Sequence, residues 1–167
     1  MTRRTSQRTV PAATLLLIAC AAVFIALSSR SLPPLVAAHF DAAGRANGYL
    51  PRGPYVAILL LITVVVPLLV VVIPHRAFSH PDARINLPNR EYWLAPERRP
   101  ETVRFLARQM SVYAWLVVIF LCFAQWLVVR ANALTPPALD SRAFFTGLAL
   151  FLACTLLWIV NLVRRFG

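Results

Sequence analysis

Four long apolar runs without a charged residue constrain this chain more than any other feature of its sequence. They cover residues 10–29, 55–73, 112–129 and 143–163. Each has the length of about 17–25 residues that a helix needs to cross a hydrocarbon core of roughly 30 Å. Backbone groups find no water there, so we expect all four runs to be helical. The sequence therefore predicts an all-α integral membrane protein with four transmembrane helices, a single membrane domain over residues 1–167.

The composition argues against a water-soluble protein. Hydrophobic residues make up 59% of the 167 residues and charged residues 14%, and one soluble domain of this length cannot hide so much apolar surface. The net charge of +11 comes from 17 arginines against six acidic residues. No soluble segment is long enough to carry a basic face, so we expect lipid headgroups as partners of these arginines and no nucleic acid.

The arginines are distributed unevenly between the two sides of the predicted helices. Twelve lie in the N-terminal segment, in the loop 74–111 and in the tail, whereas five lie in the loop 30–54 and around the last loop. Cytoplasmic loops carry the excess of positive residues in membrane proteins. We therefore predict a multi-pass membrane protein with both termini and the loop 74–111 in the cytoplasm and the loop 30–54 outside, which in a bacterium means the periplasm or the cell exterior.

The first run has two competing interpretations. Arg3, Arg4 and Arg8 precede it as in a signal peptide, and the segment that ends at Cys20 fits a lipoprotein cleavage pattern with Cys20 as the lipidated residue. The run continues through Leu27, however, which favours an uncleaved signal-anchor helix.

The three cysteines each lie in an apolar run. Cys20, Cys122 and Cys154 are odd in number and show no short ligand spacing. We expect free thiols that are buried as small hydrophobic side chains.

Few polar residues lie inside the predicted helices. Pro67, with Thr63 one turn before it, predicts a kink whose freed carbonyl is partly re-satisfied. Gln125 and Asn161 are expected to hold neighbouring helices together by hydrogen bonds. None of the runs contains Asp, Glu, Lys, Arg or His, and this argues against a pump or an ion-coupled transporter.

The loop 74–111 has room for structure of its own. Asn86 or Asn89 is placed to cap a short helix with Tyr92 and Trp93, and Pro100 suits the first turn of a new helix that continues into the third run. Seven residues are candidates for contact with the membrane interface or a partner: Asn89, Tyr92, Trp93, Arg98, Arg99, Arg104 and Arg108. We favour an interfacial helix and anionic lipids at the cytoplasmic face, because Tyr, Trp and Arg side chains settle at headgroup level.

The loop 30–54 is patterned by turn residues. Pro33-Pro34 ends the first helix and forces an extended exit. Asp41-Ala42-Ala43-Gly44 predicts a type I turn with Gly44 at positive φ, and Asn47-Gly48 predicts a second turn. Phe40 and Tyr49 bracket these turns, so we predict a short ordered external loop that resembles a hairpin.

His39 and Asp41 have the chemistry of a metal or acid–base site. One histidine and one aspartate supply too few ligands for a closed site, and no nucleophile lies nearby. We expect both side chains to hydrogen-bond the turns of the loop, and His75 and His80 to be solvated. The sequence predicts no catalytic residue, no metal and no cofactor.

The same loop carries a resemblance. Leu32-Pro33, His39-Phe40, Gly44, Asn47-Gly48-Tyr49 and the basic Arg52 resemble the signature of a bacterial membrane domain of unknown function, which also forms the N-terminal part of SdpI-type toxin-immunity proteins. The likeness covers residues 15–72. It departs from the usual pattern in having Ala37 for a second proline and Arg52 for lysine. Residues 86–97 also resemble those of short four-span members, whereas longer SdpI-type proteins carry additional helices associated with immunity and signalling. The resemblance implies a fold and a location in the bacterial cytoplasmic (inner) membrane.

Three classes of function follow from these features. The first is an immunity-like membrane protein that recognises a peptide or an envelope component through the loop 30–54. The second is an accessory or structural subunit whose loop 74–111 docks a protein partner. The third, an enzyme or a transporter, is disfavoured because the sequence shows no catalytic constellation and no charge at membrane depth. The sequence leaves the oligomeric state open.

Overall fold

The computed structural model describes residues 10–79 and 85–167. Helices dominate, and four of them are long and apolar enough to span a membrane, as the four runs predict. These four are α1 (Ala12–Ser28), α2 (Arg52–Ser79), α4 (Arg99–Asn132) and α5 (Ser141–Phe166). The shorter elements are the 3₁₀ turn η1 (Ser29–Ser31), the strands β1 (Leu35–Phe40) and β2 (Ala46–Pro51), and the helix α3 (Arg90–Trp93). The predictions for Arg3, Arg4, Arg8 and His80 lie outside the described residues.

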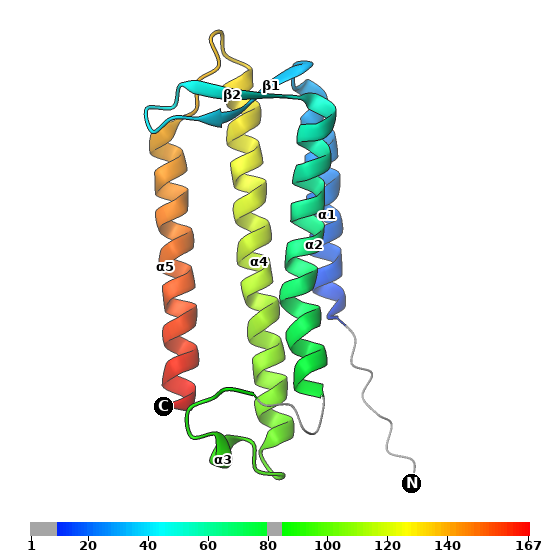
Figure 1. Ribbon diagram of the computed structural model, residues 1–167, viewed down its shortest axis with the longest axis vertical. Helices are drawn as coiled ribbons and strands as arrows, with labels where there is room; N and C mark the ends of the chain where they lie inside the picture. The colour runs from blue at the N-terminus through cyan, green and yellow to red at the C-terminus, as the bar shows by residue number, and fades with distance from the viewer. Residues whose placement is uncertain (1–9, 80–84) are drawn as a thin grey trace.

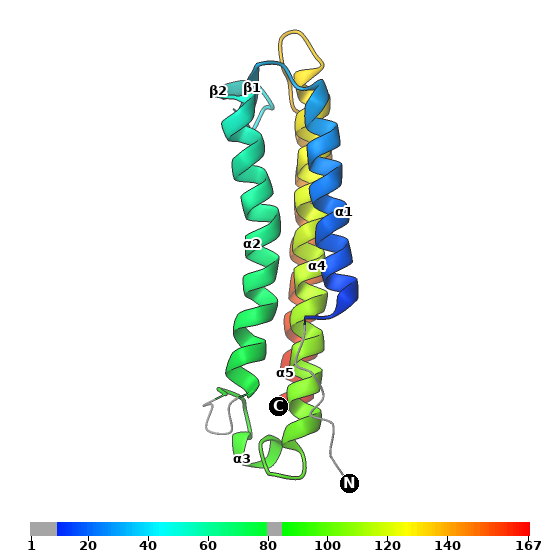
Figure 2. The same ribbon diagram turned by 90° about the vertical axis from the view of Figure 1, so that its right-hand side faces the viewer.

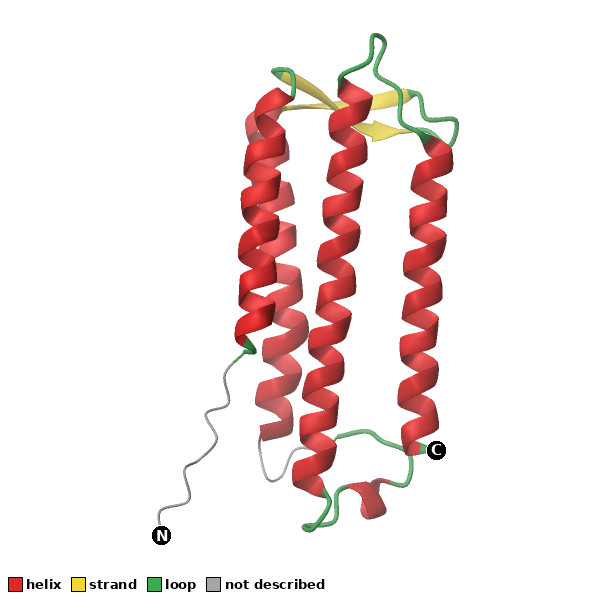
Figure 3. Cartoon of the chain, turned by 180° about the vertical axis from the view of Figure 1, so that it is seen from behind, coloured by secondary structure: helices red, strands yellow, loops and turns green. Residues whose placement is uncertain are grey.

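The long helices run side by side with α4 in the middle (Figure 1). In the described part of the chain α4 packs against α1, α2 and α5, whereas α5 packs extensively on α4 alone among the long helices. Viewed from behind, α5 stands apart from α1 and α2 (Figure 3). The sheet of β1 and β2 lies across one end of the bundle, which we call the hairpin end. The segment with α3 and the end of α5 occupy the opposite end (Figure 2).

The contact between α1 and α4 buries small and β-branched residues, while many of the larger apolar side chains face outward. Ile18 and Ala21 of α1 meet Val118 of α4 in a buried cluster. By contrast Leu16 is 66% exposed and Leu157 67% exposed. Outward apolar faces of this kind suit lipid tails, which replace water as the solvent of the bundle.

Helix α5 is held differently from its neighbours. None of the residues of its apolar stretch is buried. The ring of Phe123 on α4 lies directly against Gly147, and Nε1 of Trp158 donates to the Gln109 carbonyl of α4 at 3.1 Å. A single shared face with α4 therefore positions α5 along most of its length.

The helix boundaries extend two of the predicted runs. α2 continues past residue 73 through Pro74 to Ser79, and α4 begins at Arg99, well before residue 112. Pro100 occupies the first turn of α4 and Glu101 follows it, as predicted from the favourable place of proline and of negative charge at a helix start.

Three expectations about residues inside the helices were wrong. The Thr63 hydroxyl is buried without a hydrogen-bond partner, so it does not re-satisfy the backbone near Pro67. Asn161 is exposed on the surface of α5 and does not hold helices together. Cys20 and Cys154 are free but exposed, because they lie on the outer faces of α1 and α5.

Candidate functional site: the hairpin end

The loop 30–54 forms an antiparallel hairpin. Leu35 of β1 pairs with Pro51 of β2, and Phe40 pairs with Ala46, with irregular register between Ala37 and Phe40. The hairpin begins above α1, crosses α4 and brings its turn to the start of α5 (Figure 1). It therefore links α5 to α1 and α2, two helices that α5 contacts little in the described part of the chain.

The turn of the hairpin is built around Asp41 and Gly44. The amide of Gly44 donates to the Asp41 carbonyl at 2.9 Å, and Gly44 has a φ of 85°, as predicted. The Asp41 carboxylate accepts the backbone amide of Arg45 and its guanidinium, both at 2.8 Å. The backbone hydrogen bond from Arg45, followed by the one from its side chain, lowers the pKa of Asp41. Asp41 thus orders the turn as a charged group.

Gly44 also fixes the turn to the segment before α5. Its carbonyl accepts the Leu139 amide at 2.8 Å, and a Cβ at this position would overlap the Leu139 carbonyl oxygen. Both the left-handed backbone and the close approach of a second chain segment require glycine here.

The prediction of a second turn at Asn47-Gly48 was wrong, because both residues lie within β2. Gly48 faces His39 across the hairpin, and a Cβ on Gly48 would come within 2.9 Å of the His39 Cβ. The glycine is needed for this close approach between strands rather than for a turn. Pairing with β1 therefore overrides the local turn preference of the dipeptide.

Asn132, near the end of α4, holds the free edge of β1. Its Oδ1 accepts the Ala37 amide at 2.8 Å, and its Nδ2 donates to the Ala37 carbonyl at 3.0 Å and to the Val128 carbonyl at 2.9 Å. Ala37 is fully buried, so its backbone groups depend on this side chain. The side-chain amide of Asn132 therefore makes the two hydrogen bonds to Ala37 that a residue of a third strand would make. We call this arrangement the Asn132 clamp.

A buried polar cluster lies below the hairpin between α1, α2 and α4. The Tyr55 hydroxyl donates to Oε1 of Gln125 at 2.6 Å. Nε2 of Gln125 donates to the hydroxyls of Ser29 at 3.1 Å and Ser28 at 3.3 Å. Gln125 is 1% exposed. The prediction that Gln125 joins helices by hydrogen bonds is therefore confirmed.

His39 and Asp41 both lie on the hairpin, but each has a structural partner of its own. His39 packs against Gly48, and Asp41 binds Arg45. Across residues 10–79 and 85–167, no three His, Cys, Asp or Glu side chains gather as a metal site would require.

The rest of the predicted motif divides into anchors and an outer face. Pro33 is half-buried and leads from η1 into β1. Phe40 is half-buried beside the start of α5, where it helps to line a cavity with Ala124 and Phe144. Asn47 and Tyr49 are exposed, and Tyr49 retains 49% of its surface.

The predicted interfacial residues lie at the opposite end, and several contact α5. Nδ2 of Asn89 donates to the Phe166 carbonyl at 3.3 Å, and so does Nε1 of Trp93. Asn89 precedes α3 with a φ of 49°, but its side chain makes no cap hydrogen bond. The expected capping by Asn89 is therefore wrong, and its amide instead holds the end of α5.

The arginines of this end are mostly exposed. The Arg98 guanidinium lies 3.9 Å from the centre of the Tyr92 ring. Arg104 donates to the Pro100 carbonyl at 3.2 Å, Arg108 is exposed, and Arg99 is the first residue of α4. Contact with anionic lipids remains a prediction for this set.

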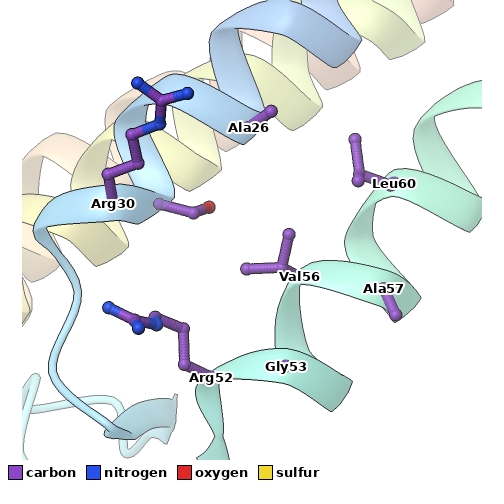
Figure 4. A pocket seen from close by; sticks show the side chains of 8 residues that line it. Ala26, Arg30, Arg52, Gly53, Val56, Ala57 and Leu60 are labelled. Carbon is purple, nitrogen blue, oxygen red and sulfur yellow. The ribbon is translucent and has the colours of Figure 1, made fainter.

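A groove opens between α1 and α2 at the hairpin end, just outside the polar cluster (Figure 4). Its volume is about 560 Å³. Arg30 and Arg52 line it from opposite sides, and the remaining lining residues are Ala26, Ser29, Gly53, Val56, Ala57 and Leu60. Neither this groove nor the Asn132 clamp is predicted from the sequence. The placement of Arg30 and Arg52 where the two apolar runs meet the loop is a signal that could have indicated the groove.

Comparison of the chain with family models, curated proteins and solved structures gave no match.

Proposed function

We propose that this chain is a multi-pass protein of the bacterial cytoplasmic membrane that recognises a peptide or an envelope component through the outer face of its hairpin. The outer face consists of the exposed side chains of Leu35, Asn47, Tyr49 and Pro51. The observation that carries the proposal is the Asn132 clamp. A simple connector between two helices does not need a side chain that hydrogen-bonds the buried backbone groups at the edge of its strand.

Preorganisation supports the proposal. The hairpin is held at Ala37 by the Asn132 clamp and at Gly44 by Leu139. A surface that is ordered before binding loses less conformational entropy on binding. Tyr49, a rigid aromatic side chain with a polar tip, is the type of residue that anchors binding interfaces.

Charge distribution supports an external hairpin. The opposite end carries most of the arginines, as cytoplasmic ends of membrane proteins do. The resemblance of the loop 30–54 to SdpI-type proteins favours toxin immunity as the setting. Recognition of this kind requires no catalytic group, so we propose a non-enzymatic role.

Site-specific photocrosslinking in cells tests the proposal. A photoreactive amino acid at position 49 should give a discrete adduct, whereas the same amino acid at position 61, an exposed site on α2, should give none. Asn132→Leu should reduce the adduct at position 49 while the protein remains in the membrane. Equal adducts from positions 49 and 61 would contradict the proposal.

A second candidate function rests on Tyr92. The ring of Trp93 packs edge-on against Phe166, whereas Tyr92 is 52% exposed and the Arg98 guanidinium lies over its ring. An exposed Tyr–Arg pair favours an accessory subunit that docks a cytoplasmic partner. Crosslinking from position 92 but not from position 49 would support this alternative over the first.

A further inference from the structure

The groove between α1 and α2 combines two charges with an apolar floor. Arg30 lies just beyond the end of α1, and Arg52 is the first residue of α2. Ala26, Val56 and Leu60 line the part that lies one or two turns further into the helices (Figure 4). The charged rim therefore lies where the apolar runs end, and the floor lies within them.

Neither arginine has a carboxylate partner in the described part of the chain. The two described acidic residues of the hairpin end are Asp41 and Asp140. Asp41 binds Arg45, and Asp140 accepts the Ala143 amide at the start of α5. Two guanidinium groups on one groove without a counter-charge favour an anionic ligand.

Arg52 is held in place by two hydrogen bonds, and part of its guanidinium group can still bind a ligand. Its Nη1 donates to the Leu32 carbonyl at 3.1 Å, and its backbone amide donates to the Pro34 carbonyl at 2.9 Å. The remaining guanidinium N–H groups can reach a phosphate, and the positive end of the α2 dipole lies at the same point. Arg30 is exposed on the facing rim, where rotation of its side chain allows it to close on the same ligand.

Small residues keep the floor of the groove open. Ala26 of α1 and Gly53 and Ala57 of α2 are among its lining residues. The hydroxyl of Ser29 is already bound to Gln125, so it contributes little to binding. The lower part of the groove is therefore shaped for a hydrocarbon chain and its upper part for a negative group.

We propose that this groove binds an anionic phospholipid, with the phosphate between Arg30 and Arg52 and an acyl chain along Ala26, Val56 and Leu60. The inference does not depend on the proposed function, because it concerns the side of the bundle between α1 and α2 and not the outer face of the hairpin.

Binding of phosphatidylglycerol to the full-length purified protein tests this site. In nanodiscs of phosphatidylcholine, a rising fraction of phosphatidylglycerol should raise the melting temperature of the protein. The variant with Arg30→Gln and Arg52→Gln should bind phosphatidylglycerol at least about tenfold more weakly, as expected for the loss of charge-assisted hydrogen bonds. The matched control Arg142→Gln removes an exposed arginine at the same end and should respond like the unmodified protein.

A second variant separates the groove from surface charge. Ala57→Trp keeps both arginines and fills the floor, so it should also lose the response, whereas Leu61→Trp on the outer face of α2 should keep it. Melting without phosphatidylglycerol shows whether each variant is folded. An equal response of the double arginine variant and Arg142→Gln would overturn the proposal. The proposal would also fail if soluble glycerol phosphate reproduced the shift, since the ligand would then need no hydrocarbon chain.

Discussion

The two ends of the bundle are closed by different chemistry. At the hairpin end, a single asparagine on α4 satisfies both backbone groups of a buried strand residue, and a glycine turn contacts the segment before α5. At the opposite end, the buried Phe166 packs against Ile85 and Leu106, with the rings of Trp93 and Phe105 edge-on to it. Hydrogen bonds to backbone groups hold the hairpin end, whereas at the opposite end the hydrogen bonds of Asn89 and Trp93 to Phe166 accompany a buried apolar cluster. The hairpin end should therefore be sensitive to single atoms and the opposite end to loss of side-chain size.

Trypsin cleaves this chain only after arginine, because the chain has no lysine. One arginine at each end can therefore report on the opening of that end. Cleavage after Arg45 requires opening of the hairpin turn, and cleavage after Arg90 requires opening of α3. Proteolysis of a transiently opened segment follows the free energy of its local opening.

The largest effect is expected from Phe166→Ala. Loss of a buried aromatic side chain costs about 3 kcal/mol, so cleavage after Arg90 should increase strongly while cleavage after Arg45 changes little. Phe145→Ala is the matched control, since Phe145 lies on the same helix and is half exposed. Equal acceleration at both arginines would show that the ends are not independent.

The next effect is expected from Gly44→Ala. Its Cβ would overlap the Leu139 carbonyl, and its backbone would be strained at positive φ, for a cost of about 2–3 kcal/mol. Cleavage after Arg45 should rise, and the amount of protein in the membrane should fall. Gly53→Ala, where nothing lies within 4 Å of the added Cβ, should leave both unchanged. If the two alanine variants behave alike, the contact between the turn and Leu139 does not stabilise the hairpin.

Asn132→Leu should have a smaller effect on the hairpin end. It leaves the amide and carbonyl of Ala37 without partners, which costs about 2 kcal/mol. Hydrogen exchange of the β1 amides should become faster, with α3 unaffected. Asn161→Leu removes the same side chain from an exposed position and should change neither end. Unchanged exchange in β1 would contradict the Asn132 clamp.

The smallest effect concerns pH. The folded-state pKa of Asp41 is lowered, chiefly by the backbone hydrogen bond from Arg45. Its stabilisation of the turn is therefore present above the ordinary carboxyl value of 3.8 and is lost as pH falls through the lower folded-state value. Exchange of the turn amides, corrected for intrinsic rates, should accelerate below pH 3.8 in the unmodified protein but not in Asp41→Asn. The same acceleration in both would exclude Asp41 as the cause.

Local patterns predicted features whose partners are near in sequence. The turn at Asp41–Gly44 and the start of α4 near Pro100 follow from backbone preferences of a few residues. The Asn47-Gly48 prediction failed because pairing with β1 decides whether the dipeptide turns or continues as a strand. Likewise the capping role expected of Asn89 gave way to a contact with the end of α5, 77 residues away.

The sequence by itself determined four helices long and apolar enough to span a membrane, because hydrocarbon leaves an uncharged run of about 20 residues no other way to satisfy its backbone. Only the tertiary structure decided that α4 is central, that Asn132 completes β1 and that Arg30 and Arg52 share a groove. The Asn132 clamp joins residues 95 positions apart, and hydropathy carries no information on such pairs. Between helices of similar apolar character, a few polar atoms and small residues select the packing.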